Sequence, residues 1–581
     1  MPVINISAFA GEKPLITPRL LPATAAKAAF NVRLDDGALT PTKKSELLAD
    51  TVSDAAHVTI YRHGDEWLSW ATTVWATSGP VAQDRLYYTG DGAPKMRVDG
   101  DVYGLKVPRP TGALSGALSG GGSGDVQSRV YAYTFVTDFG EESAPSPASA
   151  LIDWQPGDTV TLSGFEAAPA GREITKQRIY RSQTGSSGTF LYLIAERTAA
   201  ATDYVDTIDV DDFQEVLPST DWNEPPDGLS GLVSMPNGMM AGFVGRDVYF
   251  CEPWRPHAWP EKYILTCDSD VIGLGAIGSV LVVMTAAHPY IMMGAHPDSM
   301  QSQKLEANLP CINSRGIVDL GFAVCYPSNE GLVAVGADGS INLSTRQLFS
   351  REEWLSLSPT TIVGGQNAGN YVLFYDALQV DGSRSSGAML INVSAAEYLV
   401  RSREVADAVF YDAASSALYY KRPDGTNLFR FDSPDMPGET LFWRSKEFWL
   451  NRPTNFGALQ VDLGNGISLV SQAAIAEERA AITAANEIIL AADGLNSSVN
   501  DDAVNEMAIG SDTLTEFPLY GEVLVSVYGD GKLVRSVSKV GTVERLPAGF
   551  QARSWEIAVS ANVQVTQVIM AGTIDELRNT A

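Results

Sequence analysis

Histidine, the side chain most often used for acid–base chemistry and metal binding near neutral pH, occurs five times in the 581 residues. His288 and His296 lie eight positions apart, a spacing that is neither helical nor that of two metal ligands on one strand. The metalloprotease pattern His-Glu-x-x-His does not occur. The histidines therefore predict no metal site and no catalytic pair.

Other catalytic and cofactor patterns are also missing from the sequence. Neither Gly-x-Ser-x-Gly nor the phosphate-loop pattern Gly-x-x-x-x-Gly-Lys occurs. Gly273, Gly275 and Gly278 match the dinucleotide pattern Gly-x-Gly-x-x-Gly, but no alternation of helix and strand follows. A glycosidase needs two carboxyl groups about 5 to 10 Å apart, which a sequence does not show. We predict a protein without catalytic residues, cofactor or metal, and a propeller glycan hydrolase stays open as an alternative.

Acidic residues are concentrated between positions 203 and 227, where nine Asp and Glu occur. No Lys or Arg lies between Arg197 and Arg246. One interpretation is a solvated acidic loop between two domains. The other is a functional segment, although its spacing lacks the Gly and the closing Glu of an EF-hand calcium loop. The candidates for an acidic channel or interface segment are Asp203, Asp206, Asp209, Asp211, Asp212 and Glu215.

The whole chain carries 69 acidic and 41 basic side chains, a formal net charge of −28. Such a charge argues against a protein that grips the phosphates of nucleic acid. It suits a wall past which DNA must slide without sticking. Solubility alone explains the same charge, so both interpretations stay open.

The cysteines and the first residues indicate where the chain folds. Cys251, Cys267, Cys311 and Cys325 form no Cys-x-x-Cys pair, so we expect buried free thiols, which suit a reducing cytoplasm. The segment Met1-Pro-Val-Ile-Asn-Ile-Ser7 has no basic region followed by an apolar one, and no window approaches about 18 apolar residues. We expect neither a secretion signal nor a membrane span.

One strand pattern recurs between Leu232 and Asp432 at intervals of 40 to 46 residues. Each copy has an apolar strand, a tight turn and further apolar strands. The copies begin at Gly231, Val271, Ile317, Ile362 and Val405. A period in the low forties with three or four short strands per unit is typical of propeller blades. We therefore expect a mainly β fold that contains a β-propeller.

A segment rich in aromatic residues and proline lies inside this repeat. It reads Pro253-Trp-Arg-Pro-His-Ala-Trp-Pro260. Its composition predicts a turn that joins one blade to the next. The candidate blade-linking residues are Trp254, Arg255, His257 and Trp259.

The rest of the chain is divided by local composition. Pro14, Pro18 and Pro22 exclude a regular helix near the N-terminus. Polar and apolar residues alternate over 129–137, which predicts a strand of a small sandwich. The expected domains are 1–56, an extended N-terminal arm; 57–107, a first propeller blade or platform strands; 108–227, an inserted immunoglobulin/fibronectin III-like β-sandwich with a Gly/Ser linker; 228–450, the propeller blades; and 451–581, a C-terminal β region with a helical insertion at about 473–505.

The order of several short motifs resembles a known family. The motifs are Arg178-Ile-Tyr-Arg-Ser-Gln-Thr-Gly185, Asn237-Gly-Met-Met-Ala-Gly-Phe243, Glu252-Pro-Trp-Arg-Pro-His-Ala-Trp-Pro260, the segment 285–290 and Ser328-Asn-Glu-Gly-Leu-Val333. Together they resemble the tail nozzle proteins of short-tailed bacteriophages, also called tail tubular protein B. The resemblance covers about residues 1–440 and continues more weakly to the end.

The resemblance implies a structural virion protein of the phage tail, assembled in the cytoplasm of the host bacterium. Six copies would form a ring below the portal and the head-to-tail adaptor protein, carry tail fibres or spikes, and meet the host cell envelope at ejection. Double-stranded DNA would pass through the ring without specific binding. On this basis we expect the acidic residues to face the lumen. A host-receptor-binding tail spike is a further alternative, which predicts three copies rather than six.

Overall fold

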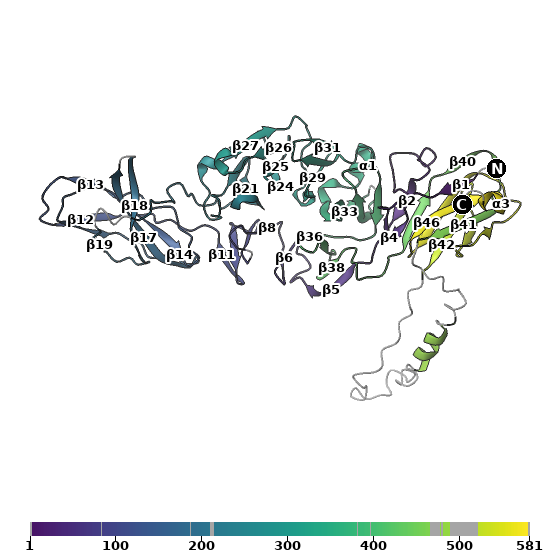
Figure 1. Ribbon diagram of the computed structural model, residues 1–581, viewed down its shortest axis with the longest axis horizontal. Coiled ribbons are helices and arrows are strands. Elements are labelled where there is room, and N and C mark those ends of the chain that lie inside the picture. Colours follow the sequence, from purple (N-terminus) through teal and green to yellow (C-terminus); the bar gives the residue numbers. More distant parts are fainter. Residues whose placement is uncertain are drawn as a thin grey trace. The chain divides into compact units, whose positions relative to one another are not determined.

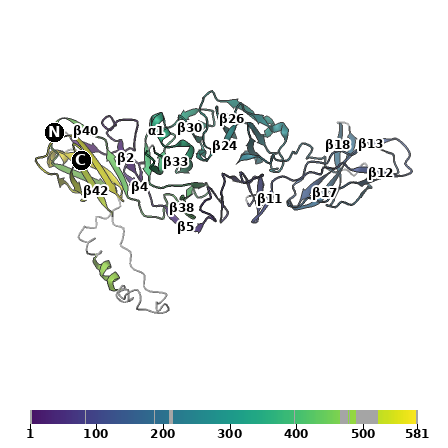
Figure 2. The same cartoon turned by 180° about the vertical axis from the view of Figure 1, so that it is seen from behind.

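The structure, a computed structural model, describes residues 3–82, 84–185, 188–208, 214–379, 381–395, 397–464, 477, 480–488 and 521–578. Two compact units make up the chain. Unit 1 comprises Met1–Glu46, Glu397–Arg403 and Phe431–Ala581, and unit 2 comprises Leu47–Ala396 and Glu404–Arg430. Both units consist mainly of β-strands, as the cartoons in Figures 1 and 2 show. The expected mainly β fold is therefore confirmed.

Within the described residues of unit 2, seven small sheets form the blades of a propeller. Blade 1 is β8 (Trp75–Ser78), β9 (Leu86–Thr89), β10 (Lys95–Val98) and β11 (Asp101–Gly104). Blade 2 is β20 (Ser230–Ser234), β21 (Met240–Val244), β22 (Asp247–Phe250) and β23 (Leu265–Thr266). Blade 3 is β24 (Val271–Ile277), β25 (Val280–Thr285), β26 (Tyr290–Met293) and β27 (Gln301–Lys304).

The remaining blades include the one that closes the ring. Blade 4 is β28 (Val318–Asp319), β29 (Ala323–Ser328), β30 (Gly331–Gly336) and β31 (Ile341–Leu343), and it is followed by the short helix α1 (Arg351–Ser356). Blade 5 is β32 (Val363–Asn367), β33 (Asn370–Leu378) and β34 (Arg384–Ile391). Blade 6 is β36 (Ala408–Asp412), β37 (Ala417–Lys421) and β38 (Asn427–Arg430), completed by β5 (Glu46–Thr51). Blade 7 is the hairpin β6 (Thr59–His63) and β7 (Glu66–Trp70).

Apolar side chains on the strand faces hold neighbouring blades together. One buried cluster joins blade 2 to blade 3 and another joins blade 3 to blade 4. The glycines that match a dinucleotide pattern serve this packing: a Cβ on Gly273 would lie 2.3 Å from Ile317 Cδ1, and one on Gly275 would lie 2.7 Å from Val324 Cγ1. Glycine is therefore present because adjacent blades approach closely there.

The sandwich is inserted between blades 1 and 2. Its strands are β12 (Ser115–Gly120), β13 (Gln127–Arg129), β14 (Tyr131–Thr137), β15 (Ile152–Trp154), β16 (Asp158–Ser163), β17 (Ile174–Gly185), β18 (Gly188–Thr198) and β19 (Tyr204–Asp206). They pair in the orders β12-β16-β19 and β14-β17-β18, with β13 on β15. The expected Gly/Ser linker contains a strand, because β12 pairs with β16 over six positions. Gly116 is needed there, since a Cβ would lie 2.1 Å from Ile152 Cδ1.

Unit 1 is a second β structure, built from both ends of the chain. One sheet has the order β35 (Leu399–Ser402), β2 (Ala26–Phe30), β39 (Leu441–Ser445), β45 (Ala552–Ala561), β42 (Val523–Gly529) and β43 (Lys532–Val537), with β40 (Phe448–Thr454) on β45. The other has the order β1 (Ile4–Ile6), β46 (Val565–Ala571), β41 (Ala458–Leu463) and β44 (Glu544–Arg545). Two short strands, β3 (Val32–Arg33) and β4 (Thr40–Pro41), and the helix α3 (Ile574–Arg578) complete it.

The N-terminal segment thus differs from the extended arm expected over 1–56. Residues 1–46 belong to unit 1, where Ile4 and Ile6 are buried in the core and Asn5 between them is exposed. This alternation is that of a strand with one buried face. The three prolines lie in the loop between β1 and β2, where they break no ladder.

The expected C-terminal helical insertion at 473–505 falls largely outside the described residues. Of that range, residues 477 and 480–488 are described, and they are helical. The four cysteines are buried and unpaired, which confirms the expected free thiols. None of the helices in the described part of the chain combines the length and the hydropathy that a membrane-spanning helix needs.

A core substitution in β1 tests whether the N-terminal segment is an integral strand. Ile6→Ala removes buried methyl groups and should lower the free energy of unfolding of unit 1 by about 2–5 kcal/mol. Hydrogen exchange of the β46 amides measures this change. The matched control is Asn5→Ala on the exposed side of the same strand, expected to change stability by less than about 1 kcal/mol. Equal effects of both substitutions would contradict the assignment.

Candidate functional site

The innermost strands of the seven blades surround a central channel. They are β8, β20, β24, β28, β32, β36 and β6, and they line a cavity of about 920 Å³. Five of them are the first strands of the five recurring copies in the sequence. The repeat therefore brings together residues that lie hundreds of positions apart in the chain.

Arg315 closes one end of this channel. Its guanidinium group donates one hydrogen bond to the Val58 carbonyl at 3.1 Å and another to the Asp407 carbonyl. Arg315, Val58 and Asp407 all precede innermost strands, so these contacts place the starts of β28, β6 and β36 at the same end. Burial lowers the pKa of the Arg315 guanidinium, which the two carbonyl acceptors partly solvate in place of water.

A buried lysine ties the same end together. The Lys421 side chain is fully buried, and its ammonium group donates to the Ala55 carbonyl and to Asp407 Oδ2, both at 2.8 Å. A buried ammonium group is tolerated only with such partners, because its desolvation costs several kcal/mol. Ala55 lies between blade 6's last strand and blade 7, so this interaction fixes the closure of the ring.

The opposite mouth of the channel carries polar side chains. Arg62, Asp319, Gln366 and Asp412 lie at the ends of the innermost strands that are remote from Arg315. Asp319 is accessible to solvent, yet surrounding protein atoms raise the pKa of its carboxyl group through desolvation. The Asp412 carboxylate accepts from Ala414 N at 3.0 Å and from Ser415 Oγ at 2.7 Å.

The chemistry available in the channel is that of binding. The described residues that line it include no His, Cys or Lys, and its ionisable groups are the carboxylates Asp319 and Asp412, the guanidinium groups Arg62 and Arg315, and two tyrosines. No group of three His, Cys, Asp or Glu side chains in the described part of the chain is arranged to hold a metal ion.

A second polar feature, the joint, connects the sandwich to the propeller. We define it as Arg85, Glu141, Glu142, Arg172 and His257. Glu141 Oε2 accepts from Arg172 Nη2 at 2.5 Å, and Glu141 Oε1 lies 3.6 Å from Arg85 Nη1 of blade 1. Arg172 is 1% exposed, and burial lowers its pKa against the opposing attraction of Glu141. An ion pair this deeply buried fixes one arrangement of the two partners.

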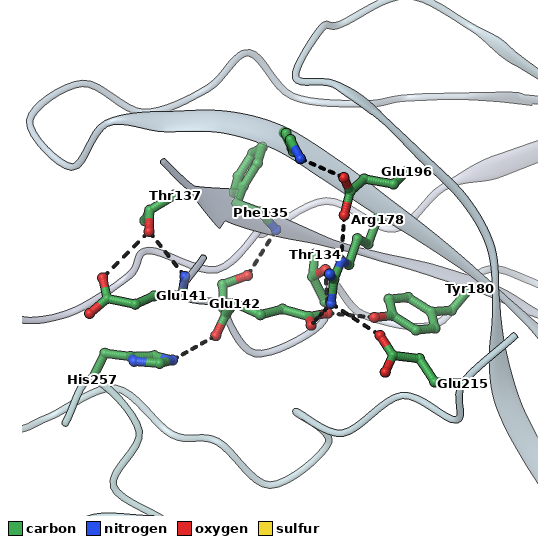
Figure 3. A network of polar contacts seen from close by, with 12 residues as sticks. Thr134, Phe135, Thr137, Glu141, Glu142, Arg178, Tyr180, Glu196, Glu215 and His257 are labelled. Carbon is green, nitrogen blue, oxygen red and sulfur yellow. Dashed lines mark hydrogen bonds and ion pairs between the residues drawn. The ribbon is translucent and has the colours of Figure 1, made fainter. Parts of the chain in front are cut away.

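The neighbouring Glu142 faces the other way, into the sandwich (Figure 3). Its Oε1 accepts from Thr134 Oγ1 at 2.8 Å and from Tyr180 OH at 2.6 Å. Its Oε2 accepts from Arg178 Nη1 at 2.9 Å. Glu141 thus contacts Arg85 of blade 1, and Glu142 contacts side chains inside the sandwich. The segment that follows β14 therefore connects the sandwich to blade 1.

His257 completes the joint from the segment 253–260, which lies between β22 and β23 of blade 2 and not between two blades as expected. Its Nε2 carries the proton and donates to the Glu142 carbonyl at 3.0 Å, also drawn in Figure 3. Trp259 is buried in the cluster that blades 1 and 2 share. Trp254 is 54% exposed, and the exposed Arg255 lies over the Trp222 ring at 5.6 Å. This turn therefore contacts two blades through Trp259 and the sandwich through His257.

The acidic candidates from the sequence do not gather on one surface of the described residues. The Asp206 side chain is fully buried, where Oδ2 accepts from Arg181 Nη1 at 2.7 Å and from Tyr131 OH at 2.8 Å. Glu215 pairs with Arg178 at 3.2 Å, and Asp203 is exposed. Asp209, Asp211 and Asp212 lie outside the described residues. Asp206 therefore contributes to the sandwich core and supplies no surface charge.

Comparisons with known proteins add only distant structural neighbours. No family model and no curated protein matches the chain. An exo-β-1,3-galactanase from Phanerochaete chrysosporium is 9% identical with a TM-score of 0.18, over 58% of this chain and 95% of that one. The extracellular domain of a putative hybrid two-component system from B. thetaiotaomicron is 7% identical with a TM-score of 0.22, over 76% of this chain and 57% of that one. Similarity this low carries no argument about function.

Removing the buried cation tests the joint. Arg172→Met leaves Glu141 buried with a weaker partner, so the free energy of unfolding of unit 2 should fall by about 3–5 kcal/mol. The matched control is Lys176→Met, which breaks an ion pair with Glu196 whose lysine is 52% exposed and should cost about 0–1 kcal/mol. Denaturant unfolding measures both values. Equal decreases in the free energy of unfolding for the two variants would show that the buried Arg172–Glu141 pair contributes no more to stability than the exposed Lys176–Glu196 pair.

The pH dependence of stability tests His257. Burial lowers the pKa of His257 to about 4 from 6.5, so the folded state holds the imidazole neutral. The unfolded chain takes up the proton first, and stability is lost as the pH falls from about 6.5 to about 4, by about 3 kcal/mol. His257→Gln keeps a donor for the Glu142 carbonyl and should lose less stability over this range. Identical pH profiles from denaturant unfolding would contradict this assignment.

Proposed function

We propose that the chain is a structural subunit of the nozzle, the distal tail tube of a short-tailed bacteriophage. The observation that carries the proposal is the order along the chain of the segments 178–185, 237–243, 252–260, 285–290 and 328–333. Their order resembles that of tail nozzle proteins. The propeller with its inserted sandwich supports the proposal, because it supplies a rigid wall element and a module that reaches outward from it.

The path of the genome would lie between copies of the chain. The channel within one propeller has a volume of about 920 Å³ and is closed at one end by Arg315. A DNA duplex does not pass through a cavity of that size. A conduit therefore requires several chains, and a homo-hexameric ring closed by heterologous contacts provides one.

The net charge of −28 supports a conduit that does not hold DNA. Phosphates bind proteins through Lys and Arg, and an acidic wall repels them at short range. In this proposal the double-stranded DNA passes without specific binding. The further partners are the head-to-tail adaptor protein, tail fibres or spikes, and the host cell envelope at ejection. The chain would reside in the virion tail after assembly in the cytoplasm of the host bacterium.

The proposed role is structural and not enzymatic. The channel is the natural place for a reaction in a propeller, and its described lining offers carboxyl, amide and hydroxyl groups without histidine, cysteine or lysine. Buried ion pairs of unit 2 lie instead at ring closure, at the joint and in the sandwich core, where they fix the positions of parts. This distribution supports a scaffold.

The number of chains in the purified assembly tests the proposal. Native mass spectrometry should find six copies, and negative-stain images should show closed rings, since the conduit requires several chains. Gold-labelled antibodies against the protein should bind at the tail tip of virions. Three copies would favour the receptor-binding spike instead. A monomer at assembly concentrations, or label on the capsid, would reject the proposal.

A further inference from the structure

The propeller channel has the form of a one-ended binding pocket. Arg315 crosses from blade 4 to blades 6 and 7 and closes one end. The other end is open and polar, with Asp319, Gln366 and Asp412 at the ends of three innermost strands. Its volume of about 920 Å³ lies within the range of about 300–1,000 Å³ that is typical of small-molecule sites. The pocket is large enough for a ligand of two or three rings.

The formal charge of the pocket differs from that of the chain. Its described lining contains two cations, Arg62 and Arg315, and two carboxylates, Asp319 and Asp412, which sum to zero. The chain as a whole carries −28. A neutral pocket in an acidic protein is suited to a ligand that has many polar groups and no net charge.

Of the two cations in the pocket, Arg315 is held by the protein, whereas the buried Nε of Arg62 has no hydrogen-bond partner among the described residues. Arg62 Nη2 lies 3.6 Å from Asp65 Oδ1. The Arg315 Nη2 donors meet the carbonyls of Val58 and Asp407. Phosphate and sulfate groups are held by guanidinium groups whose paired donors are available to them. The donors of Arg315 are therefore not available to a phosphate group.

The remaining lining groups match a polyhydroxylated ring. The Asp319 carboxylate accepts hydrogen bonds, the Gln366 amide both donates and accepts, and the hydroxyl groups of Thr77 and Ser78 do both. Half-buried aromatic side chains, Tyr411 beside Asp412 among them, lie in the same lining and offer apolar surface. A sugar ring has the same combination, with hydroxyl groups at its rim and C–H groups on its faces.

We propose that the propeller channel binds a neutral saccharide of one to three rings through its open mouth. Asp319 and Gln366 would accept and donate hydrogen bonds to the sugar hydroxyl groups, and Tyr411 would pack against a ring face. No bond is made or broken in this proposal. It goes beyond the nozzle role, because a pocket within one propeller would give each subunit its own contact with a glycan, whatever the number of copies in the assembly.

Calorimetric titration of the full-length protein tests this proposal. The probes are neutral disaccharides, namely maltose, cellobiose, lactose and chitobiose, with digalacturonate and inorganic phosphate as charged comparisons. At least one neutral disaccharide should bind. Asp319→Asn and Gln366→Ala should each weaken that binding about tenfold, the loss expected for one hydrogen bond to a charged or amide group. The matched control is Asp338→Asn in the exposed turn of the same blade, which should leave affinity unchanged.

Melting temperatures separate a lost contact from a lost fold. If either variant melts at a lower temperature, a cryo-EM or crystal map of the unaltered protein with the bound disaccharide decides, and it should place the sugar among Asp319, Gln366 and Tyr411. The proposal is overturned if none of the neutral disaccharides binds at millimolar concentration, if phosphate or digalacturonate binds in preference, or if the sugar lies elsewhere. Any of these outcomes leaves the native mass of the assembly, and hence the nozzle proposal, unaffected.

Discussion

The closure of the propeller ring at Lys421 is the interaction on which the rest of unit 2 depends. Its buried ammonium group binds the Ala55 carbonyl and the Asp407 carboxylate, and so joins blade 6 to the segment that enters blade 7. β5, which lies at the N-terminal end of the propeller sequence, pairs with β38 and so completes blade 6, whose other strands lie at the C-terminal end. Without this closure the innermost strands would have no common axis, and neither the channel nor the position of Arg315 would exist.

The joint solves a related problem for the inserted sandwich. An insertion on two flexible connections would move freely, because interfaces between modules of one chain are usually small. Here the Arg85–Glu141 ion pair and the His257–Glu142 contact attach the insertion to blade 1 and to the turn between β22 and β23 of blade 2. Buried charges contribute little net stability, yet any other arrangement would leave them unpaired. The consequence is one orientation of the insertion on blade 1, which the proposed ring subunit would need in order to fit its neighbours.

The propeller itself was predictable from local pattern, because each blade repeats one period and its first strand becomes an innermost strand. The segment around Trp259 was expected to join two blades in sequence, whereas it lies within blade 2 and reaches blade 1 only through packing. The range 57–107 was expected to form one blade or platform strands, whereas it forms both blade 7 and blade 1; the strand that β5 adds to blade 6 was not predictable, because its partner lies far away in the sequence. The alternation Ile4-Asn5-Ile6 of β1 is that of a strand with one buried face. Three residues are too few to predict a strand, and the three prolines that follow favoured an extended arm.

The site residues were harder to predict for the same reason. Asp206 is in an acidic stretch, and only the fold shows that Arg181 and Tyr131 bury it. Arg315, Asp319 and Gln366 belong to no motif, and they matter because strands from different blades converge on one axis. The alternation of polar and apolar residues along the chain predicts which face of a strand is buried. It does not predict a channel, because the channel is lined by residues from seven separate strands.

The central claim is that this scaffold forms one segment of an acidic conduit. A cryo-EM map of the purified assembly tests it most directly, because the map gives both the number of copies and the side chains that face the lumen. The account predicts six propeller subunits around a lumen lined mainly by Asp and Glu. A lumen that is neutral or basic, or an assembly without a continuous central passage, would contradict it.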